Sequence, residues 1–469
     1  MSREPTRRRV QGNTSNLGLA AIIRRYAATT RVHKQSNDSG FSIGGACGPS
    51  WSLRSLLGVS SALPRNSLLS LVSAGLLGCA GTPATPERVT PAPPADDAFI
   101  LRTADGKNEL RLGALLQVLA RASDDARDPT TDFELKRMRP EFSGQLAGSL
   151  AFNLEPNFAE DEVELEEAWL GPMLFGGRAI LHLGRMKAPF NLEEVRSRRH
   201  IDFPFFSIVN QFAPAEDNGA FLNGTTPARR YEYGLAVYNG TGGSDTNGSK
   251  DVAARLMLHP FVEDSGAPLE NLQLGIAGTF GNQDLSLEDE AIDNETKLPV
   301  VRFTPDAELE GERGRAGVEL AWFRGPWFLQ SEYLAVQQEM SSATSEEDVR
   351  FHGGYVTLSH VLTGEAKSFR GVAPDEPFDF QSATGRGAWV LAARYSILNL
   401  DDDLEAALVV PGTFTDQIQT ASVGLNWIPN THSIVRLAAV ASFYEGDVRL
   451  DTGSGDREGA VLIEFQVHY

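Results

Sequence analysis

Arginine is the residue type in this chain best suited to binding chemistry. Its planar guanidinium stays charged at ordinary pH and donates paired hydrogen bonds to phosphate or carboxylate oxygens. The segment from Pro189 to Arg230 gathers arginines around the aromatic run Phe203–Phe206 and is too long for a tight turn. Long loops without regular structure are usually functional or disordered, so we expect this one to present cations to small anions. The arginines concerned are Arg196, Arg198, Arg199, Arg229 and Arg230.

A structural alternative applies to the same arginines. Carboxylates are abundant in this segment, and each of them could pair with a guanidinium and withdraw it from any anion path. The sequence alone leaves both interpretations open. The carboxylates concerned are Glu193, Glu194, Asp202, Glu216 and Asp217.

Other chemistry finds no support in the sequence. The chain has no nucleophile elbow, P-loop or zinc-binding spacing. Its acidic stretches Glu160–Glu167 and Asp284–Glu312 lack the residue order of an EF-hand. We expect both stretches to be solvated turns or external loops, and we expect no enzymatic activity, cofactor or metal site.

Composition narrows the class of protein. The 469 residues are 41% hydrophobic and 22% charged, and no apolar run is long enough for a membrane-spanning helix. A net charge of -20 opposes binding to nucleic acid. The 45 glycines and 25 prolines against 6 methionines favour a turn-rich, all-β body.

The first 97 residues differ from the rest of the chain. Residues 1–64 are basic and without periodicity, which indicates a disordered or non-native N-terminal extension. Residues 65–80 have the length of a secretory signal and end in a sequence resembling a lipobox, with Cys79 as the lipidation candidate. An ordinary signal peptide is the alternative. Residues 81–97 form a Pro/Thr-rich linker, and residues 98–469 form the folded body.

The body shows period-two alternation. At the C-terminus Val461, Ile463, Phe465, Val467 and Tyr469 are apolar, while most residues between them are polar. The apolar face of such strands meets either a second sheet or, in an outer-membrane barrel, lipid. In the barrel the opposite face lines a water-filled lumen and the terminal aromatic residue lies at the membrane interface.

Sixteen segments show this pattern, an even number that suits a bacterial transmembrane β-barrel. Their spacing allows a span of about ten residues with alternating short turns and long loops. The predicted strands are 98–103, 109–119, 133–143, 145–154, 164–173, 177–187, 228–240, 250–260, 270–281, 312–323, 327–338, 349–361, 387–398, 416–428, 433–445 and 457–469.

Basic residues within these strands are candidates for the lumen. The phase of the alternation indicates most clearly that Arg394 and Arg436 point inward, because their neighbours on either side are apolar. The strand candidates are Arg139, Arg185, Lys187, Arg255, Arg394 and Arg436.

From about residue 110 onward the chain resembles the phosphate-selective porin O and P family of Gram-negative outer membranes. Three segments carry much of the resemblance: Leu135–Arg139, Leu183–Phe190 and Gly387–Ser396. The resemblance adds Arg137 to the lumen candidates and implies a sixteen-stranded, trimeric, anion-permeable barrel with an inward-folding loop. Only six lysines follow residue 98, which departs from a strongly phosphate-selective pattern.

These observations together predict an outer-membrane porin for small hydrophilic solutes, with some preference for anions such as phosphate. A closed barrel with an adhesion or anchoring role is the main alternative, and a secreted soluble β enzyme is a more distant one. The expected partners are small anions, outer-membrane lipid with lipopolysaccharide, two further copies of the chain, and the barrel assembly machinery. That machinery would recognise the C-terminal strand ending at Tyr469.

Overall fold

The computed structural model describes residues 99–469, apart from 124–130, 160–162, 244, 246, 265, 289 and 451–452. The predictions for residues 1–64, 65–80 and 81–97, including lipidation at Cys79, concern residues that lie outside this range. Within the described residues, no helix has the length and hydrophobicity needed to cross a bilayer.

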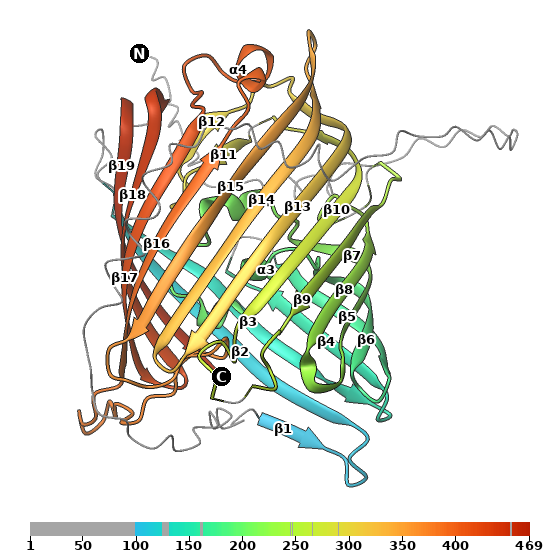
Figure 1. Cartoon of the computed structure of the whole chain (residues 1–469), viewed down its shortest axis with the longest axis vertical. Coiled ribbons are helices and arrows are strands. Elements are labelled where there is room, and N and C mark those ends of the chain that lie inside the picture. Colours follow the sequence, from blue (N-terminus) through green and yellow to red (C-terminus); the bar gives the residue numbers. More distant parts are fainter. Residues whose placement is uncertain are drawn as a thin grey trace, which may run out of the picture.

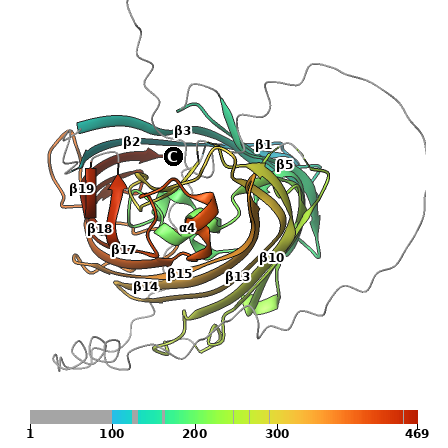
Figure 2. The ribbon, with the colours of Figure 1, turned by 90° about the horizontal axis from the view of Figure 1, so that it is seen from above.

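Sixteen strands of the described chain form one closed antiparallel barrel (Figures 1 and 2). Each strand pairs with its sequence neighbour in the ring, and β19 pairs with β2 to close it, for example Phe465 with Val118. The strands are β2 (Glu109–Ser123), β3 (Thr131–Leu146), β4 (Leu150–Asn157), β5 (Glu164–Leu174), β6 (Ala179–Lys187), β7 (Glu216–Thr225), β8 (Tyr231–Tyr238), β9 (Asp251–Leu258), β10 (Gln273–Ser286), β13 (Glu308–Arg324), β14 (Trp327–Ser341), β15 (Glu346–Val361), β16 (Ala388–Asn399), β17 (Gln417–Asn430), β18 (Ser433–Leu450) and β19 (Gly453–His468).

The alternation predicted from the sequence sets the two faces of the wall. In β16, Trp389 and Leu391 are 36% and 45% exposed on the outer face, whereas Val390 and Arg394 are buried inside. Because a closed barrel leaves no strand edge, every strand can satisfy its backbone through its neighbours and present apolar side chains to lipid.

The two ends of the barrel differ in their connections. Short turns such as 147–149, 325–326 and 431–432 lie at the end where β2 begins and β19 stops, and short turns are typical of the periplasmic side. Aromatic residues lie near this end on the outer face, among them Trp327, which is 43% exposed. The longer loops lie mainly at the opposite, extracellular end.

Three extracellular loops pack an apolar core inside the barrel, so the upper part of the lumen is narrower than a simple water-filled cylinder. They are residues 188–215, residues 287–307 with the small hairpin β11 (Ala291–Asp293) and β12 (Pro299–Arg302), and residues 400–416 with α4 (Asp403–Leu408). Figure 2 shows α4 within the ring of strands. The core includes Phe190, Ile208, Phe212, Ile292, Val300, Val301, Leu334, Val336, Phe351, Leu398, Leu404 and Val448.

This core confirms the inward-folding loop and corrects a second expectation. The acidic stretches Glu160–Glu167 and Asp284–Glu312 were both expected to be solvated. Glu166 of the first is instead buried in β5, and the central part of the second folds inward. Ile292 and Val301 are fully buried, and the Glu295 side chain is 1% exposed. The apolar residues Ile292, Val300 and Val301 explain the difference, because burying them stabilises the folded-in hairpin.

The count of sixteen is right, although two assignments behind it were wrong. The predicted strand 98–103 is β1 (Phe99–Arg102), which pairs with residues 109–112 of β2 and lies outside the ring. The segment from Pro189 to Arg230, expected to be one loop, contains β7. Its glycines hid the period-two pattern, but they allow close packing: a Cβ at Gly219 would lie 2.7 Å from the Cβ of Tyr238.

Candidate functional site

The inward loop, residues 188–215, crosses the lumen and is held there by the barrel wall. The short helix α3 (Leu192–Val195) begins opposite Glu332 of β14. The backbone N–H groups of Leu192 and Glu193 each donate to the Glu332 carboxylate at 2.7 Å. A charge-assisted pair of this kind fixes both the position and the direction of the loop.

A buried arginine joins this loop to the second inward segment. Arg394 of β16 donates to Glu193 at 3.1 Å and to Glu295 at 2.5 Å, and its side chain is 3% exposed. Ser207 donates its backbone N–H to both oxygens of the Glu193 carboxylate. The guanidinium lies 4.5 Å from the centre of the Phe203 ring. Arg394 therefore points inward, but its donors bind the loops rather than open lumen.

Arg436 of β18 has a similar structural position. It donates to the carbonyl oxygens of Ile201 at 3.0 Å and Arg199 at 2.7 Å, and to Glu464 at 2.5 Å. Its side chain is 1% exposed. Arg196 of the loop is likewise occupied: it donates to the His200 carbonyl and lies 4.5 Å from the Phe369 ring centre.

Burial and nearby cations also fix the charge of one loop residue. Desolvation, together with His468 and Arg436, holds the pKa of His200 well below its usual range. His200 is therefore neutral at pH 7 and adds no positive charge to the lumen.

A β-bulge in β3 places neighbouring cations on the inner face. Arg137 pairs with Gln117 of β2, but Leu135 pairs with Val118, so Lys136 is an extra residue in the register. Lys136 contacts Glu464 at 3.2 Å, and Arg137 donates to Gln117 at 2.6 Å. The bulge therefore lets two consecutive side chains point inward, which strict alternation forbids.

Charged side chains form a belt between the inward loop and β3–β7. Arg198 pairs with Glu194 at 2.6 Å, and Arg139 pairs with Glu155 at 3.3 Å and also with Glu166. The belt consists of the cations Arg137, Arg139, Lys187, Arg198 and Arg199 and the carboxylates Glu141, Glu155, Glu166, Glu194 and Glu216.

Arg137 differs from the other cations of the belt. Among the described residues, no carboxylate lies within ion-pair distance of its guanidinium, whose contact is the amide oxygen of Gln117. Each of the other belt cations makes an ion pair with a carboxylate of the belt. Within the described residues, Arg137 is therefore the belt cation that lacks a direct ion pair.

A polar vestibule adjoins the belt inside the barrel. This cavity of about 420 Å³ lies against the inner face of β5–β9 near the turns 175–178 and 226–230. It is lined by both signs of charge, including Lys187, Arg255 and Glu167. Arg255 also pairs with Glu319 at 2.6 Å.

The remaining candidates lie outside the belt. Arg185 shares the outward face of β6 with Leu183 and donates to the carbonyl oxygens of Leu165 and Gly242 at 2.5 Å. Arg229 and Arg230 are in the periplasmic turn after β7 rather than in the inward loop, and Arg229 lines the polar vestibule at that end. The Arg229 side chain is 74% exposed, and Arg230 pairs with Glu263 at 2.7 Å.

Pairing with carboxylates therefore describes much of what the loop arginines do, as the structural alternative proposed. Sequence reasoning missed Glu295, Glu332 and Lys136. The inward phase of Glu332 was visible in the alternation of β14, but its partner was not. Within the described ranges, no three His, Cys, Asp or Glu side chains are grouped so that they could hold a metal ion.

A closed sixteen-stranded barrel with an apolar exterior, a loop folded into its lumen and a belt of charge inside is the architecture of an outer-membrane porin. Residues 109–469 match the family described as phosphate-selective porin O and P, and the chain belongs to that family. It is accordingly a protein of the Gram-negative outer membrane and not an enzyme.

Individual relatives are more distant. Porin O of Pseudomonas aeruginosa strain PAO1 is 28% identical over 150 residues, which cover 30% of this chain and 32% of that protein. The alignment therefore spans about a third of the length of that relative.

Solved structures share the fold. The outer membrane channel DcaP of Acinetobacter baumannii is 9% identical, with a TM-score of 0.51, covering 79% of this chain and 99% of the channel. In-vitro folded OmpT, an outer membrane protein of Vibrio cholerae, is 10% identical, with a TM-score of 0.49, covering 79% of this chain and all of that one.

Removing the Arg394 guanidinium should destabilise the inward loop. The variant Arg394→Met leaves Glu193 and Glu295 buried without their cation, at an expected cost of about 3–5 kcal/mol in the free energy of unfolding. Urea unfolding in detergent micelles and proteolysis of the inward loop would measure this loss of stability.

The control is Arg229→Met, whose side chain is 74% exposed and should have little effect. Equal unfolding midpoints for the two variants would contradict the anchoring role of Arg394.

Proposed function

We propose that the barrel is a water-filled channel for passive diffusion of small hydrophilic solutes, with a preference for anions such as phosphate. The observation that carries the proposal is that Arg137, unlike the other cations of the belt, makes no ion pair within the described residues, while the belt adjoins a polar vestibule. Charges that line a constriction control selectivity, because low-dielectric walls focus their field.

The degree of preference follows from the composition of the belt. Its other cations are paired with carboxylates, so their fields largely cancel at short range. A weakly selective pore is therefore expected rather than one that excludes cations. The scarcity of lysine in the barrel is consistent with this modest selectivity.

A second candidate function is a closed, non-conducting barrel with an adhesion or anchoring role. It is favoured by the apolar core that fills part of the extracellular lumen. Liposomes containing the folded protein distinguish the two functions, since swelling in small sugars requires an open path and a sealed barrel gives none.

Neutralising Arg137 should weaken the anion preference. With Arg137→Gln we expect the chloride-to-potassium permeability ratio to fall by about two- to fivefold, because one focused positive charge is lost. Reversal potentials in planar bilayers under a KCl gradient measure this ratio.

Arg185→Gln is the matched control, since it removes the same charge from the outward face of the neighbouring wall and should leave the ratio unchanged. A wild-type channel that prefers potassium would reject the proposed anion preference.

We further propose that three copies of the chain associate through the wall formed by β6–β9. These strands have only eight to ten residues. At about 3.4 Å per residue and a tilt near 40°, eight residues rise only about 20 Å, less than the apolar band of about 25 Å.

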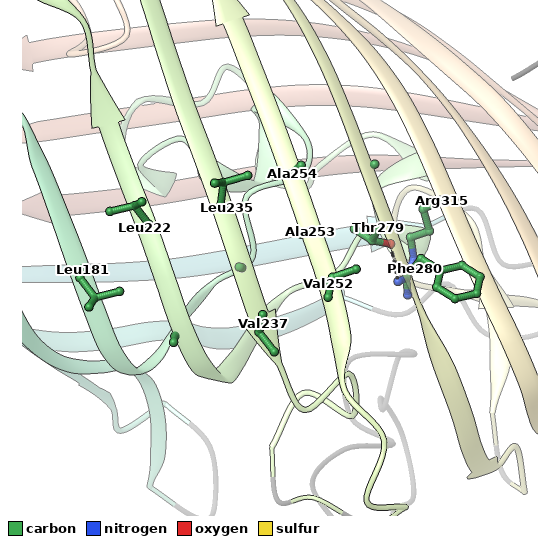
Figure 3. A pocket seen from close by; sticks show the side chains of 13 residues that line it. Leu181, Leu222, Leu235, Val237, Val252, Ala253, Ala254, Thr279, Phe280 and Arg315 are labelled. Carbon is green, nitrogen blue, oxygen red and sulfur yellow. Dashed lines mark hydrogen bonds between the residues drawn. The ribbon is translucent and has the colours of Figure 1, made fainter. Parts of the chain in front are cut away.

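The outer surface of this wall also has a hollow suited to a protein contact. The hollow of about 620 Å³ is lined mostly by apolar side chains of β6–β10, including Leu235, Val252 and Phe280 (Figure 3). Small residues such as Ala220 and Ala254 lie among them. Close packing between copies would use these small side chains.

Filling this hollow should dissociate the copies. We expect Ala254→Trp to convert trimers into monomers in detergent, as measured by light scattering coupled to size-exclusion chromatography. Ala439→Trp, an outward alanine on the long strand β18, should leave the trimer intact. A monomeric wild-type protein would contradict the proposal.

Recognition by the barrel assembly machinery is proposed to depend on Tyr469. The Tyr469 backbone N–H donates to Ala114 at 3.0 Å, and the side chain is 48% exposed on the outer face. Tyr469→Ala keeps this backbone bond and removes the aromatic ring. We expect Tyr469→Ala to lower the yield of assembled barrel in cells while leaving refolding in detergent unchanged. Tyr395→Ala, which removes another outward ring, is the control. Equal cellular yields for the two variants would contradict the role of Tyr469 in recognition.

A further inference from the structure

The longest periplasmic connection, residues 362–387 between β15 and β16, contains a compact arm that lies beside the wall. The arm, residues 376–387, folds back on itself: the backbone N–H groups of Asp379 and Gly387 donate to Thr384 and Glu376 at 2.8 and 2.9 Å. Figure 1 shows this connection, in orange, extending sideways below the ends of β16 and β17. The first part of the connection turns inward, where Lys367 pairs with Asp202 of the inward loop, whereas the arm reaches the outward Trp427 of β17 through Phe378.

The arm is docked on the periplasmic end of two strands. The N–H of Phe378 donates to the Pro429 carbonyl at 2.7 Å, and the indole N–H of Trp427 donates to the Arg386 carbonyl at 3.0 Å. Gly387 has φ +66° and no room for a side chain, since a Cβ would lie 2.6 Å from the Ile428 carbonyl. The return of the arm into β16 is thus fixed by backbone contacts.

Docking creates one continuous aromatic cluster from the arm and the wall. The ring of Phe378 lies 5.2 Å from Trp427 and 5.2 Å from Phe380, and Trp427 lies 6.0 Å from Trp389. Phe380 is 62% exposed and Trp389 is 36% exposed. These contacting rings form a contiguous exposed apolar patch, and such a patch marks a surface that contacts protein or membrane.

The cluster continues the lipid-facing surface of the barrel. Trp389 begins the outward row of β16 that leads through Leu391 to Tyr395, and Trp427 ends the outward row of β17. Aromatic side chains favour the level of the lipid headgroups, where the ring meets acyl chain and the polar groups meet water. The exposed carboxylate Asp379 lies between Phe378 and Phe380 in the sequence and can stay in water.

We propose that the arm is a membrane foot, which seats Phe378 and Phe380 in the headgroup boundary of the inner, phospholipid leaflet of the outer membrane. The foot extends the aromatic girdle with two rings that belong to a loop rather than to a strand. The two rings contact the phospholipid headgroup boundary, because the aromatic cluster is continuous with the surface that the barrel already presents to lipid.

The test is a site-specific depth measurement on the full chain. The chain has two cysteines, Cys47 and Cys79, so a Cys47→Ser/Cys79→Ser background allows one new thiol to be labelled. Phe380→Cys carries an environment-sensitive fluorophore in phosphatidylcholine vesicles. Leu391→Cys, on the lipid-facing wall, and Thr344→Cys, in an exposed extracellular turn, are the controls.

We expect a nitroxide placed near the lipid headgroup to quench the label at position 380 at least about half as strongly as at position 391. Iodide in the water should quench it about threefold less than at position 344. Heat-modifiable migration of each labelled protein confirms that it is folded.

Two results would overturn the proposal. Strong iodide quenching without nitroxide quenching would place the arm in water. Shielding from both quenchers would place it against another protein chain instead of lipid.

Discussion

The fold depends first on one property of the membrane: its hydrocarbon offers no hydrogen-bond partners to the peptide groups of the backbone. A peptide group that faces lipid must bond within the protein, and an extended chain can do so only if its sheet closes on itself. The pairing of β19 with β2 provides this closure, and the sixteen strands then set the diameter of the interior. Everything inside the barrel, from the inward loop to the charged belt, is arranged within that fixed enclosure.

Closure leaves the interior to be filled by the loops, and buried charge determines how they fill it. Arg394 and Arg436 extend from the wall and bind backbone or carboxylate groups of segments far away in the chain. A guanidinium that loses its water must find several acceptors at once, which gives such contacts directional specificity. The apolar side chains around Ile292 stabilise the folded-in hairpin by burial, but such contacts do not fix its orientation as hydrogen bonds do. The two kinds of contact together hold the inward segments in one place.

The sequence predicted the barrel well because alternation is a local property. The phase of Arg394 and Arg436 could be assigned from their apolar neighbours alone. The strand β7 escaped because Gly219 and Gly224 replace the side chains that would have marked its faces; the packing that requires them involves β8 and was not visible locally. The bulge at Lys136 likewise depends on the register with β2.

Roles inside the lumen were harder to predict, since they depend on which loop meets which wall. The same guanidinium can serve a solute or anchor a loop, and only the position of its acceptors distinguishes these roles. Arg394 has acceptors on two inward segments, whereas Arg137 contacts a neutral amide. The contribution of an arginine to the proposed anion path therefore depends on how much of its positive charge is left unbalanced by neighbouring carboxylates.

By the same reasoning, a net charge of -20 does not oppose the proposed anion preference. Many of its carboxylates lie on the exterior; Glu308, Glu310 and Glu312 at the extracellular start of β13, for example, are in contact with solvent. Salt screens such charges over about 8 Å at physiological ionic strength. A half-buried charge in a narrow, low-dielectric belt is screened much less. The proposed selectivity therefore depends on belt charges such as that of Arg137 rather than on the carboxylates at the rim.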